Sequence, residues 1–469
     1  MTAASLTQRR YYGARLSQVL MLAGMIFLGV LCGVLGTKGW ILGAGFLAVA
    51  ALVLVIAPLP LVWWTMMVVF YYLVENYVST KVSTPISWSL LFAFLGACWW
   101  EQIRQRRPVE YVEPRLWTAI LLWMGWGVFT GLFAVDYGEA AKELGRYALS
   151  FAMLLTYMNW LRTESQLRVM VKIWMVVTLL LGAIYTLEAV VNGFSHTAAE
   201  YPPLHSELGI LFAVMIPVSL AFIFLGPQTR RLPMGIGTGI MIVAMIWSHS
   251  RSSYLAALVG TIIVLAYRFP RAIRRLVKAA GLAVLAAGLC ALCNPAWARR
   301  LVYGLSGRDR VWSAAIQAIQ QHPLVGVGPG GWSGWFGKNF TAVDFLLHDL
   351  DGNSFFLTPS ELHGEAHNLF LTKAAEMGIL SALGVVAILF FWFRAALPAV
   401  RSLPLGRVRV IAVGCMASMT GLAARCFFEN GPIIGKARGV EIIMVWFVAV
   451  LPLVAHRMVT QPSETKPSS

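Results

Sequence analysis

The sequence predicts an all-α integral membrane protein with about 12 to 14 transmembrane helices and one large periplasmic loop. Three observations lead to this fold class. Hydrophobic residues make up 58% of the chain and charged residues only 12%. The mean hydropathy of +0.71 is far above that of an ordinary soluble domain. Finally, long apolar stretches recur along the chain, and a polar segment, residues 294–367, interrupts them.

The candidate spans come from apolar windows of roughly 17 to 25 residues, the length a helix needs to cross the hydrocarbon core. About fourteen such windows are present. The second, third and fourth are the least secure because Pro58, Pro60 and Pro85 punctuate them, so about twelve or thirteen crossings stay possible. The approximate span centres are Met25, Ala48, Val68, Phe92, Met124, Met153, Val177, Val214, Met241, Leu258, Ala286, Val385, Ala417 and Val445.

The distribution of Lys and Arg predicts the orientation of these spans, because cytoplasmic loops hold the excess of positive charge. In the fourteen-span arrangement, more than half of the 37 basic residues fall on one side. That side and both termini are predicted to be cytoplasmic. The polar segment then lies in the periplasm of a two-membrane bacterium, with the protein as a multi-pass component of the inner membrane. The basic clusters on the cytoplasmic side are 9–15, 104–115, 162–172, 230–231, 268–278, 394–409 and 457–466.

The domain organisation follows from this pattern. We expect a polytopic membrane domain, 1–456, with the periplasmic loop 294–367 inserted in it, and a cytoplasmic tail, 457–469. The net charge of +16 reflects the topological bias and contact with anionic lipid headgroups, so no nucleic-acid partner is expected. The six cysteines lie mostly in or beside apolar spans and do not indicate a disulfide framework.

A short helix is predicted inside the polar segment. Trp312, Ile316 and Ile319 recur at i, i+4 and i+7, which is an apolar stripe at helical spacing. Arg308 and Arg310 stand at its start, where the positive end of a helix favours anions. The helix is expected to pack on the bundle or lie on the membrane. An anion site is one interpretation, and a solvated amphipathic helix whose arginines contact lipid phosphates is the other.

The turn Gly326–Gly331 has the spacing G-x-G-x-x-G, which elsewhere marks a dinucleotide-binding loop. No strand pattern precedes it and no helix of a βαβ unit follows it, so its context does not fit that function. We expect a tight or flexible connection next to Trp332 and Trp335.

Arg251 lies between two apolar spans that are separated by almost no loop. An arginine at membrane depth is costly, so it normally faces the protein interior or a wet cavity and has an anionic partner. Arg251 is therefore a candidate functional residue. The alternative is an arginine that extends its guanidinium group to the outer membrane interface.

His367 lies where the polar segment meets the next apolar span. A histidine can accept a proton near neutral pH, which makes it a candidate general base. A structural histidine is the alternative, and Glu365 could serve as the base instead. The nearby histidines have no zinc-site spacing, so no metal is expected. They are His322, His348 and His363.

These motifs occur in a fixed order on one predicted side of the membrane, and with this order the chain resembles the superfamily of O-antigen ligases and O-antigen polymerases. The resemblance covers about residues 208–383. It implies a metal-independent, inverting glycosyltransferase without a cofactor, which takes a glycan from undecaprenyl diphosphate outside the cytoplasm. The motifs are Ser250-Arg251-Ser252, Gly307-Arg308-x-x-Val311-Trp312, His322-Pro323-Leu324-Val325-Gly326-Val327-Gly328, Ala366-His367-Asn368 and Glu376-x-Gly378.

The resemblance also implies roles for single residues. Arg251 and Arg308 match the arginines that hold the diphosphate, and His367 matches the essential histidine of the superfamily. Arg310 is added as a diphosphate ligand from its position alone. Many members carry an asparagine in the segment that here reads His205-Ser206-Glu207, which leaves the acceptor side open. Secondary candidates near the site are Glu365, Asn368 and Trp312.

The chemistry fits these residue types independently. A lipid diphosphate is an activated leaving group, so the enzyme chiefly needs fixed guanidinium groups and a base for the attacking hydroxyl. The partners would be the carrier-linked glycan, a lipid A-core or glycan acceptor, and membrane lipids. A ligase and a polymerase use the same donor and stay open as alternatives. A transporter of lipid-linked sugar is the third, although no inverted halves with broken helices are visible in the sequence.

Overall fold

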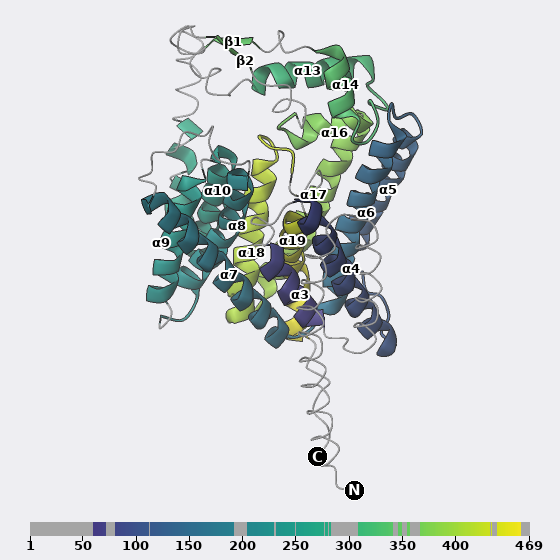
Figure 1. Cartoon of the computed structure of the whole chain (residues 1–469). Helices are drawn as coiled ribbons and strands as arrows, with labels where there is room; N and C mark the ends of the chain where they lie inside the picture. The colour runs from purple at the N-terminus through teal and green to yellow at the C-terminus, as the bar shows by residue number, and fades with distance from the viewer. Residues whose placement is uncertain are drawn as a thin grey trace.

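A computed structural model of the protein shows a bundle of long helices that carries a cap of short elements at one end (Figure 1). The description covers most of the chain from residue 60 to residue 460. The described residues are 60–71, 80–111, 113–191, 204–228, 231–248, 250–275, 277–279, 281–282, 308–340, 346–348, 354–356, 366–431, 433 and 439–460.

The bundle is built from long apolar helices at the positions where the sequence predicts spans. The span centres Met25, Ala48 and Ala286 lie outside the described residues, and each of the others lies in or directly beside a helix. The helices are α3 (Pro60–Val69), α4 (Thr80–Arg104), α5 (Pro114–Gly131), α6 (Tyr137–Trp160), α7 (Glu164–Val191), α8 (Leu204–Leu225), α9 (Arg231–Trp247), α10 (Arg251–Arg268), α17 (Ile379–Ser402), α18 (Arg407–Arg425) and α19 (Gly439–Thr460).

Three helices in the described part of the chain are long and apolar enough to cross a membrane by themselves: Glu164–Leu187 of α7, α17 and α18. Shorter apolar helices of 10 to 17 residues occur in α3, α8, α9 and α19. This composition is that of an all-α membrane protein.

Close helix contacts hold α18 in the middle of the bundle. A side chain at Gly421 would meet the carbonyl oxygen of Ala256 in α10 at 2.2 Å, and one at Gly414 would meet the backbone of Val218 in α8 at 2.7 Å. Glycines at such positions let helix backbones approach closely, which is how helices associate in lipid. The position of α18 therefore depends on α8 and α10 over most of its length.

The polar segment forms the cap at the upper end of the bundle in Figure 1. It contains α13 (Arg308–Gln321) and α14 (Trp332–Asn339), and α16 (Leu369–Met377) follows it and leads directly into α17. Two short strands, β1 (Leu346–His348) and β2 (Ser354–Phe356), pair antiparallel with Leu346 opposite Phe356. The structure thus differs in one feature from the expected all-α fold, because its cap contains a small two-stranded sheet.

Helix α13 forms where the sequence predicts it, but it buries a different face. The buried residues are Val311, Ala314, Ala315 and Ala318, whereas Ile316 is 47% exposed. Small alanines allow α13 to pack closely against α16. Of the predicted stripe, Ile316 is turned outward, while Trp312 and Ile319 are half-buried. Of the two expected placements, on the bundle or on the membrane, α13 packs on the rest of the protein, and the centre of its buried face differs from the stripe.

The glycine-rich turn is a tight connection between α13 and α14. Gly326, Gly328 and Gly330 have φ angles of 64°, 100° and 67°, in the left-handed region that glycine adopts at little cost. The turn is bound to the end of α16, because the amide of Gly328 donates to the carbonyl oxygen of Glu376 at 2.8 Å. A side chain at Gly328 would meet Cα of Ala134, between α5 and α6, at 2.6 Å. The turn therefore anchors the cap to the bundle.

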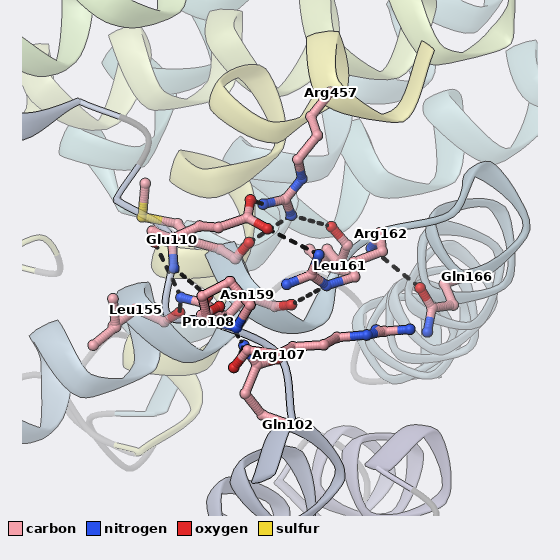
Figure 2. Close-up of polar contacts among 11 residues, drawn as sticks. Gln102, Arg107, Pro108, Glu110, Leu155, Asn159, Leu161, Arg162, Gln166 and Arg457 are labelled. Atoms are coloured by element: carbon pink, nitrogen blue, oxygen red, sulfur yellow. Dashed lines mark hydrogen bonds and ion pairs between the residues drawn. The ribbon is translucent and has the colours of Figure 1, made fainter. Parts of the chain in front are cut away.

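The opposite end of the bundle is fixed by a cluster of ion pairs around Glu110 (Figure 2). The Glu110 carboxylate accepts from Arg162 at 3.0 Å and from Arg457 at 2.5 Å, and its amide donates to Asn159 at 2.8 Å. Asn159 lies at the far end of α6 from Glu143, which contacts the glycine-rich turn. Arg162 and Arg457, predicted to lie on one side of the membrane, thus both pair with Glu110, across the bundle from the cap.

Candidate functional site

The candidate site is organised around the carboxylate of Glu429, in the segment that follows α18. Oε1 of Glu429 lies 2.7 Å from Nη2 of Arg308, the first residue of α13. Oε2 lies 3.0 Å from Nδ1 of His367, just before α16. The hydroxyl of Ser252, in the first turn of α10, lies 3.5 Å from Oε1. One carboxylate therefore joins residues from three parts of the chain that are far apart in sequence.

The contact with Glu429 determines which nitrogen of His367 can act as a base. An ionised carboxylate only accepts hydrogen bonds, so Nδ1 of His367 must be the donor. In the neutral ring, Nε2 then has the lone pair and can accept a proton. This is the arrangement by which a carboxylate orients the histidine base in catalytic triads.

The electrostatic surroundings keep Glu429 ionised. Burial by itself raises the pKa of a carboxyl group, but the hydrogen bond with His367 and the charges of His367, Arg425 and Arg308 lower the pKa of Glu429 below its ordinary value. The carboxylate is thus negatively charged at neutral pH. It can hold the Nδ1 proton of His367 throughout the physiological range.

The backbone at His367 is held in an uncommon conformation. Its φ of 47° lies in the left-handed region, which is uncommon for residues other than glycine. Asn368 begins α16 directly after it, and its side chain accepts from the amide of Leu371 at 3.0 Å and donates to the carbonyl oxygen of Phe427 at 3.0 Å. Asn368 is thus a helix cap that also ties His367 to the segment carrying Glu429.

A further arginine, Arg425, lies at the end of α18. Its side chain is 5% exposed, and Nη1 donates to the carbonyl oxygen of Gly431 at 2.8 Å. Its charge is one of those that lower the pKa of Glu429. Arg425 therefore stabilises the loop 426–431 through this hydrogen bond and adds positive charge to the site.

Arg251 is the first residue of α10 and is exposed, while its neighbours Ser252 and Ser253 are buried. The hydroxyl of Ser253 lies 2.8 Å from that of Ser250. A side chain at Gly209 in α8 would meet the Ser253 hydroxyl at 2.9 Å, so a glycine is needed where α8 passes this turn. The start of α10 is thus fixed in place beside Glu429, with Arg251 on its surface.

A cluster of buried charged residues lies between α16 and α6. Nζ of Lys373 lies 2.6 Å from Glu376 in α16 and 3.6 Å from Glu143 in α6. It also donates a hydrogen bond to the hydroxyl of Tyr147. Arg146 pairs with Glu143 at 2.9 Å. Lys373, Glu376 and Glu143 are at most 2% exposed, so their opposite charges neutralise one another in the protein interior. These contacts fix α16 on α6.

The structure brings together some of the residues that the sequence singles out. Arg308 and His367 share Glu429, and Arg251 begins the helix whose Ser252 reaches the same carboxylate. The ring centroid of Trp312 lies 6.5 Å from that of Phe428, next to Glu429. Glu365, His363 and the side chain of Arg310 lie outside the described residues. His322 is exposed, in the turn that ends α13.

Comparison with known families gives a match over part of the chain. Residues 236–386 match the model of a family described as O-antigen ligase. This part of the chain is thus similar to O-antigen ligases. The search of curated proteins finds no match for the chain. The match confirms the resemblance noted in the sequence, and it indicates an enzyme that transfers glycans, of the ligase or polymerase type.

The part that matches O-antigen ligases contains Arg251, Arg308 and His367 but ends before Arg425 and Glu429. Sequence reasoning missed both of these residues. A signal for Glu429 was present, because it is the one acidic residue between Glu376 and Glu441, a stretch that includes two apolar spans. A carboxylate at a membrane boundary is costly unless it has a cationic partner, so it could have been matched to the candidate arginines.

Proposed function

We propose that the chain transfers a glycan from a polyprenyl diphosphate carrier, undecaprenyl diphosphate in bacteria, to an acceptor hydroxyl at the capped end of the bundle. The observation that carries this proposal is the shared carboxylate of Glu429, which unites a cationic side chain, Arg308, with an oriented histidine, His367. The match of residues 236–386 to the O-antigen ligase family supports it. Under the predicted orientation, this end faces the periplasm.

The diphosphate is proposed to bind the arginines. The charges of Arg308 and Arg425 lower the pKa of Glu429, and Arg251 begins the helix whose Ser252 reaches the same carboxylate, so these three arginines are the proposed ligands of the two phosphates. Arg308 contacts Glu429 through Nη2, and a guanidinium group has five N–H donors, so its other edge can bind a phosphate oxygen. Arg310, next in the same helix turn, is kept as an additional ligand on the basis of the sequence.

The transfer step needs no metal or cofactor in this scheme. The acceptor oxygen attacks the anomeric carbon from the face opposite the diphosphate, so a new glycosidic bond forms with inversion while the bond from that carbon to the phosphate oxygen breaks. The electron pair of that bond leaves with the carrier diphosphate. Nε2 of His367 takes the proton of the acceptor hydroxyl, and Glu429 stabilises the resulting imidazolium.

The arginines stabilise the charge that develops on the leaving diphosphate, which is the main requirement for catalysis with such a donor. Fixed cations at a site with little water act strongly, because no reorganisation is needed when the charge develops. Glu365 and Trp312 remain secondary candidates from the sequence. Asn368 contributes by fixing the backbone of His367, as its hydrogen bonds indicate.

The reconstituted enzyme tests the proposal. Purified protein is incubated with carrier-linked glycan and either lipid A-core or additional donor, and the products are separated by size. Attachment of glycan to the core lipid supports a ligase, and a ladder of longer carrier-linked chains supports a polymerase, the alternative with the same donor. If neither product forms but the lipid-linked sugar crosses a vesicle membrane, the chain is a transporter and the proposal is wrong.

A further inference from the structure

A cavity lies at the other end of the bundle, away from Glu429. It has a volume of about 690 Å³ and is enclosed by α7, α8, α9 and α18. Its lining includes Arg407, the first residue of α18, whereas Arg425 at the candidate site is the last residue of the same helix. With 1.5 Å per residue, these two points are about 27 Å apart, close to the thickness of a hydrocarbon core. The cavity thus opens near the opposite membrane surface.

The cavity is divided into a basic mouth and an apolar interior. The mouth is lined by the exposed side chains of Arg168, Lys172 and Arg407. Further along α7 the lining continues with Met175, Val176 and Leu179 on the same helix face. Met241 of α9 and Ile411 of α18 are buried and close the interior. Charge therefore gives way to apolar surface with increasing depth into the bundle.

The basic mouth is only weakly neutralised by the protein. Glu164 lies 3.6 Å from Arg168, and both side chains are nearly half exposed. In the described part of the chain, no carboxylate lies within 4.0 Å of Lys172 or Arg407. Nearby, Arg162 and Arg457 are already paired with Glu110 (Figure 2). The mouth thus has an excess of positive charge that an anion can compensate.

We propose that this cavity binds an anionic glycerophospholipid from the leaflet on that side of the membrane. Its headgroup phosphate would contact Arg168, Lys172 and Arg407, and an acyl chain would extend into the apolar interior. The order of charge and apolar surface along α7 matches that of a lipid from headgroup to chain. Basic pockets between transmembrane helices are known to bind such headgroups. The volume lies within the range of ordinary ligand cavities.

Gly237 in α9 shows how the space is kept open. Its Cβ position would meet Cδ1 of Leu179 at 3.5 Å, which is ordinary contact, so a single methyl group fits there. A leucine at this position would extend further into the interior and compete with an acyl chain. Ser219 and Thr238 share a hydrogen bond of 2.8 Å beside it, so the polar groups of the wall are satisfied by the protein. The interior is therefore suited to an apolar occupant.

The site is tested with the full-length protein in neutral detergent, by native mass spectrometry and by thermal unfolding. The probes are a phosphatidylglycerol, a phosphatidylcholine with the same acyl chains, and glycerol 3-phosphate, which has the headgroup phosphate without chains. Phosphatidylglycerol is expected to bind as one tight adduct and to raise the unfolding temperature. The other two probes should bind at least about tenfold more weakly, because each lacks one of the two contacts.

Two variants separate the headgroup contact from the chain contact. Replacing Arg168, Lys172 and Arg407 together by Gln is expected to weaken phosphatidylglycerol binding by about fivefold per basic residue removed. These residues are exposed, so the variant should fold. Gly237→Leu keeps the charges and fills the interior, and it should abolish the tight adduct. The matched control replaces Arg271, Arg274 and Arg275, exposed basic residues outside the cavity, by Gln.

The outcomes are distinct. Loss of binding in the triple Gln variant and retention in the control support the site. If the control loses binding equally, the lipid responds to the general positive charge of this surface, and the proposal is wrong. If phosphatidylcholine binds as tightly as phosphatidylglycerol, or if the triple Gln variant binds like wild type, the basic mouth has no role and the proposal is also wrong. Neither readout depends on glycan transfer, so the result is independent of the proposed function.

Discussion

Nδ1 of His367 lies 3.0 Å from Oε2 of Glu429, and the other oxygen of the same carboxylate lies 2.7 Å from Arg308. The histidine is thereby fixed in orientation and in tautomer, and it is placed next to a cation that can hold a phosphate group. A base and an anion-binding group positioned by one carboxylate form a compact arrangement for displacement at a sugar phosphate. The role of Glu429 is therefore the first to be tested.

We expect Glu429→Gln to lower kcat by about a hundredfold to ten-thousandfold, because an amide can donate to Nδ1 and thereby favour the wrong tautomer of His367. The KM for the donor should change much less. The rate is measured with carrier-linked glycan and saturating acceptor. Glu139→Gln is the matched control, since Glu139 is an exposed carboxylate at the same end of the bundle. A Glu429→Gln enzyme as active as this control would exclude the orienting role.

Glycan transfer should depend on the shape of the side chain at position 308 as well as on its charge. Arg308→Ala is expected to lower kcat/KM for the donor by about a hundredfold to a thousandfold, the usual effect of removing a group that stabilises a developing anion. Arg308→Lys should recover only part of this loss, because an ammonium group cannot contact phosphate oxygens in two places. The unfolding temperature should change less than in Glu429→Gln, because His367 and Arg425 still compensate the charge of the Glu429 carboxylate.

Lys338→Ala provides the comparison for Arg308, as Lys338 is exposed on α14 in the same cap. This variant should transfer glycan like wild type. Activity of Arg308→Ala within a factor of about two of the Lys338→Ala variant would mean that Arg308 does not contact the diphosphate. A sharp loss of folded protein with Arg308→Ala would instead assign it a structural role.

The lowered pKa of Glu429 predicts how stability depends on pH. A carboxyl group whose pKa is lower in the folded protein stabilises it fully above its ordinary pKa of about 4.3, and this contribution disappears as the pH falls through the folded value. The difference in unfolding temperature between wild type and Glu429→Gln should thus be largest near pH 7 and shrink as the pH decreases below about 4.3. Differential scanning fluorimetry across this range measures it. A difference that does not change with pH would contradict the ion pairs.

Much of the bundle could be predicted from the sequence, because the cost of exposing backbone polar groups to lipid forces long apolar helices wherever the composition allows. The described helices accordingly lie where the apolar windows are centred, as α4 does around Phe92. The face of α13 could not be predicted from residue size. Its buried side consists mainly of alanines. Small residues are needed there because α16 approaches closely, and their hydrophobicity alone does not mark them as the buried face.

The candidate site could be predicted only in part for a related reason. Arg308 and His367 belong to recognisable local motifs, whereas Glu429 follows α18 and meets them through contacts that span 121 and 62 residues. No local periodicity carries information about such a contact. Lys373 was missed in the same way, because its partner Glu143 lies in a helix far back in the chain. In both cases the pairing is defined by how the helices pack.

The buried cluster below α16 gives a last prediction. Lys373→Met leaves Glu376 and Glu143 in the interior with Arg146 as the remaining cation, so we expect a loss of stability of about 3 to 5 kcal/mol. Lys142→Met, which removes an exposed lysine, should be nearly neutral. Both are measured by thermal unfolding in detergent at pH 7.

Adding Glu376→Gln to Lys373→Met should restore part of the stability, because the double variant removes one positive and one negative charge together. Since α16 follows directly after His367 and Asn368, the single variant should also lower the rate of glycan transfer, and the double variant should recover both properties in parallel. Recovery of stability without recovery of rate would mean that Lys373 acts on the reaction directly. An unchanged unfolding temperature in Lys373→Met would show that the cluster does not hold α16 on α6.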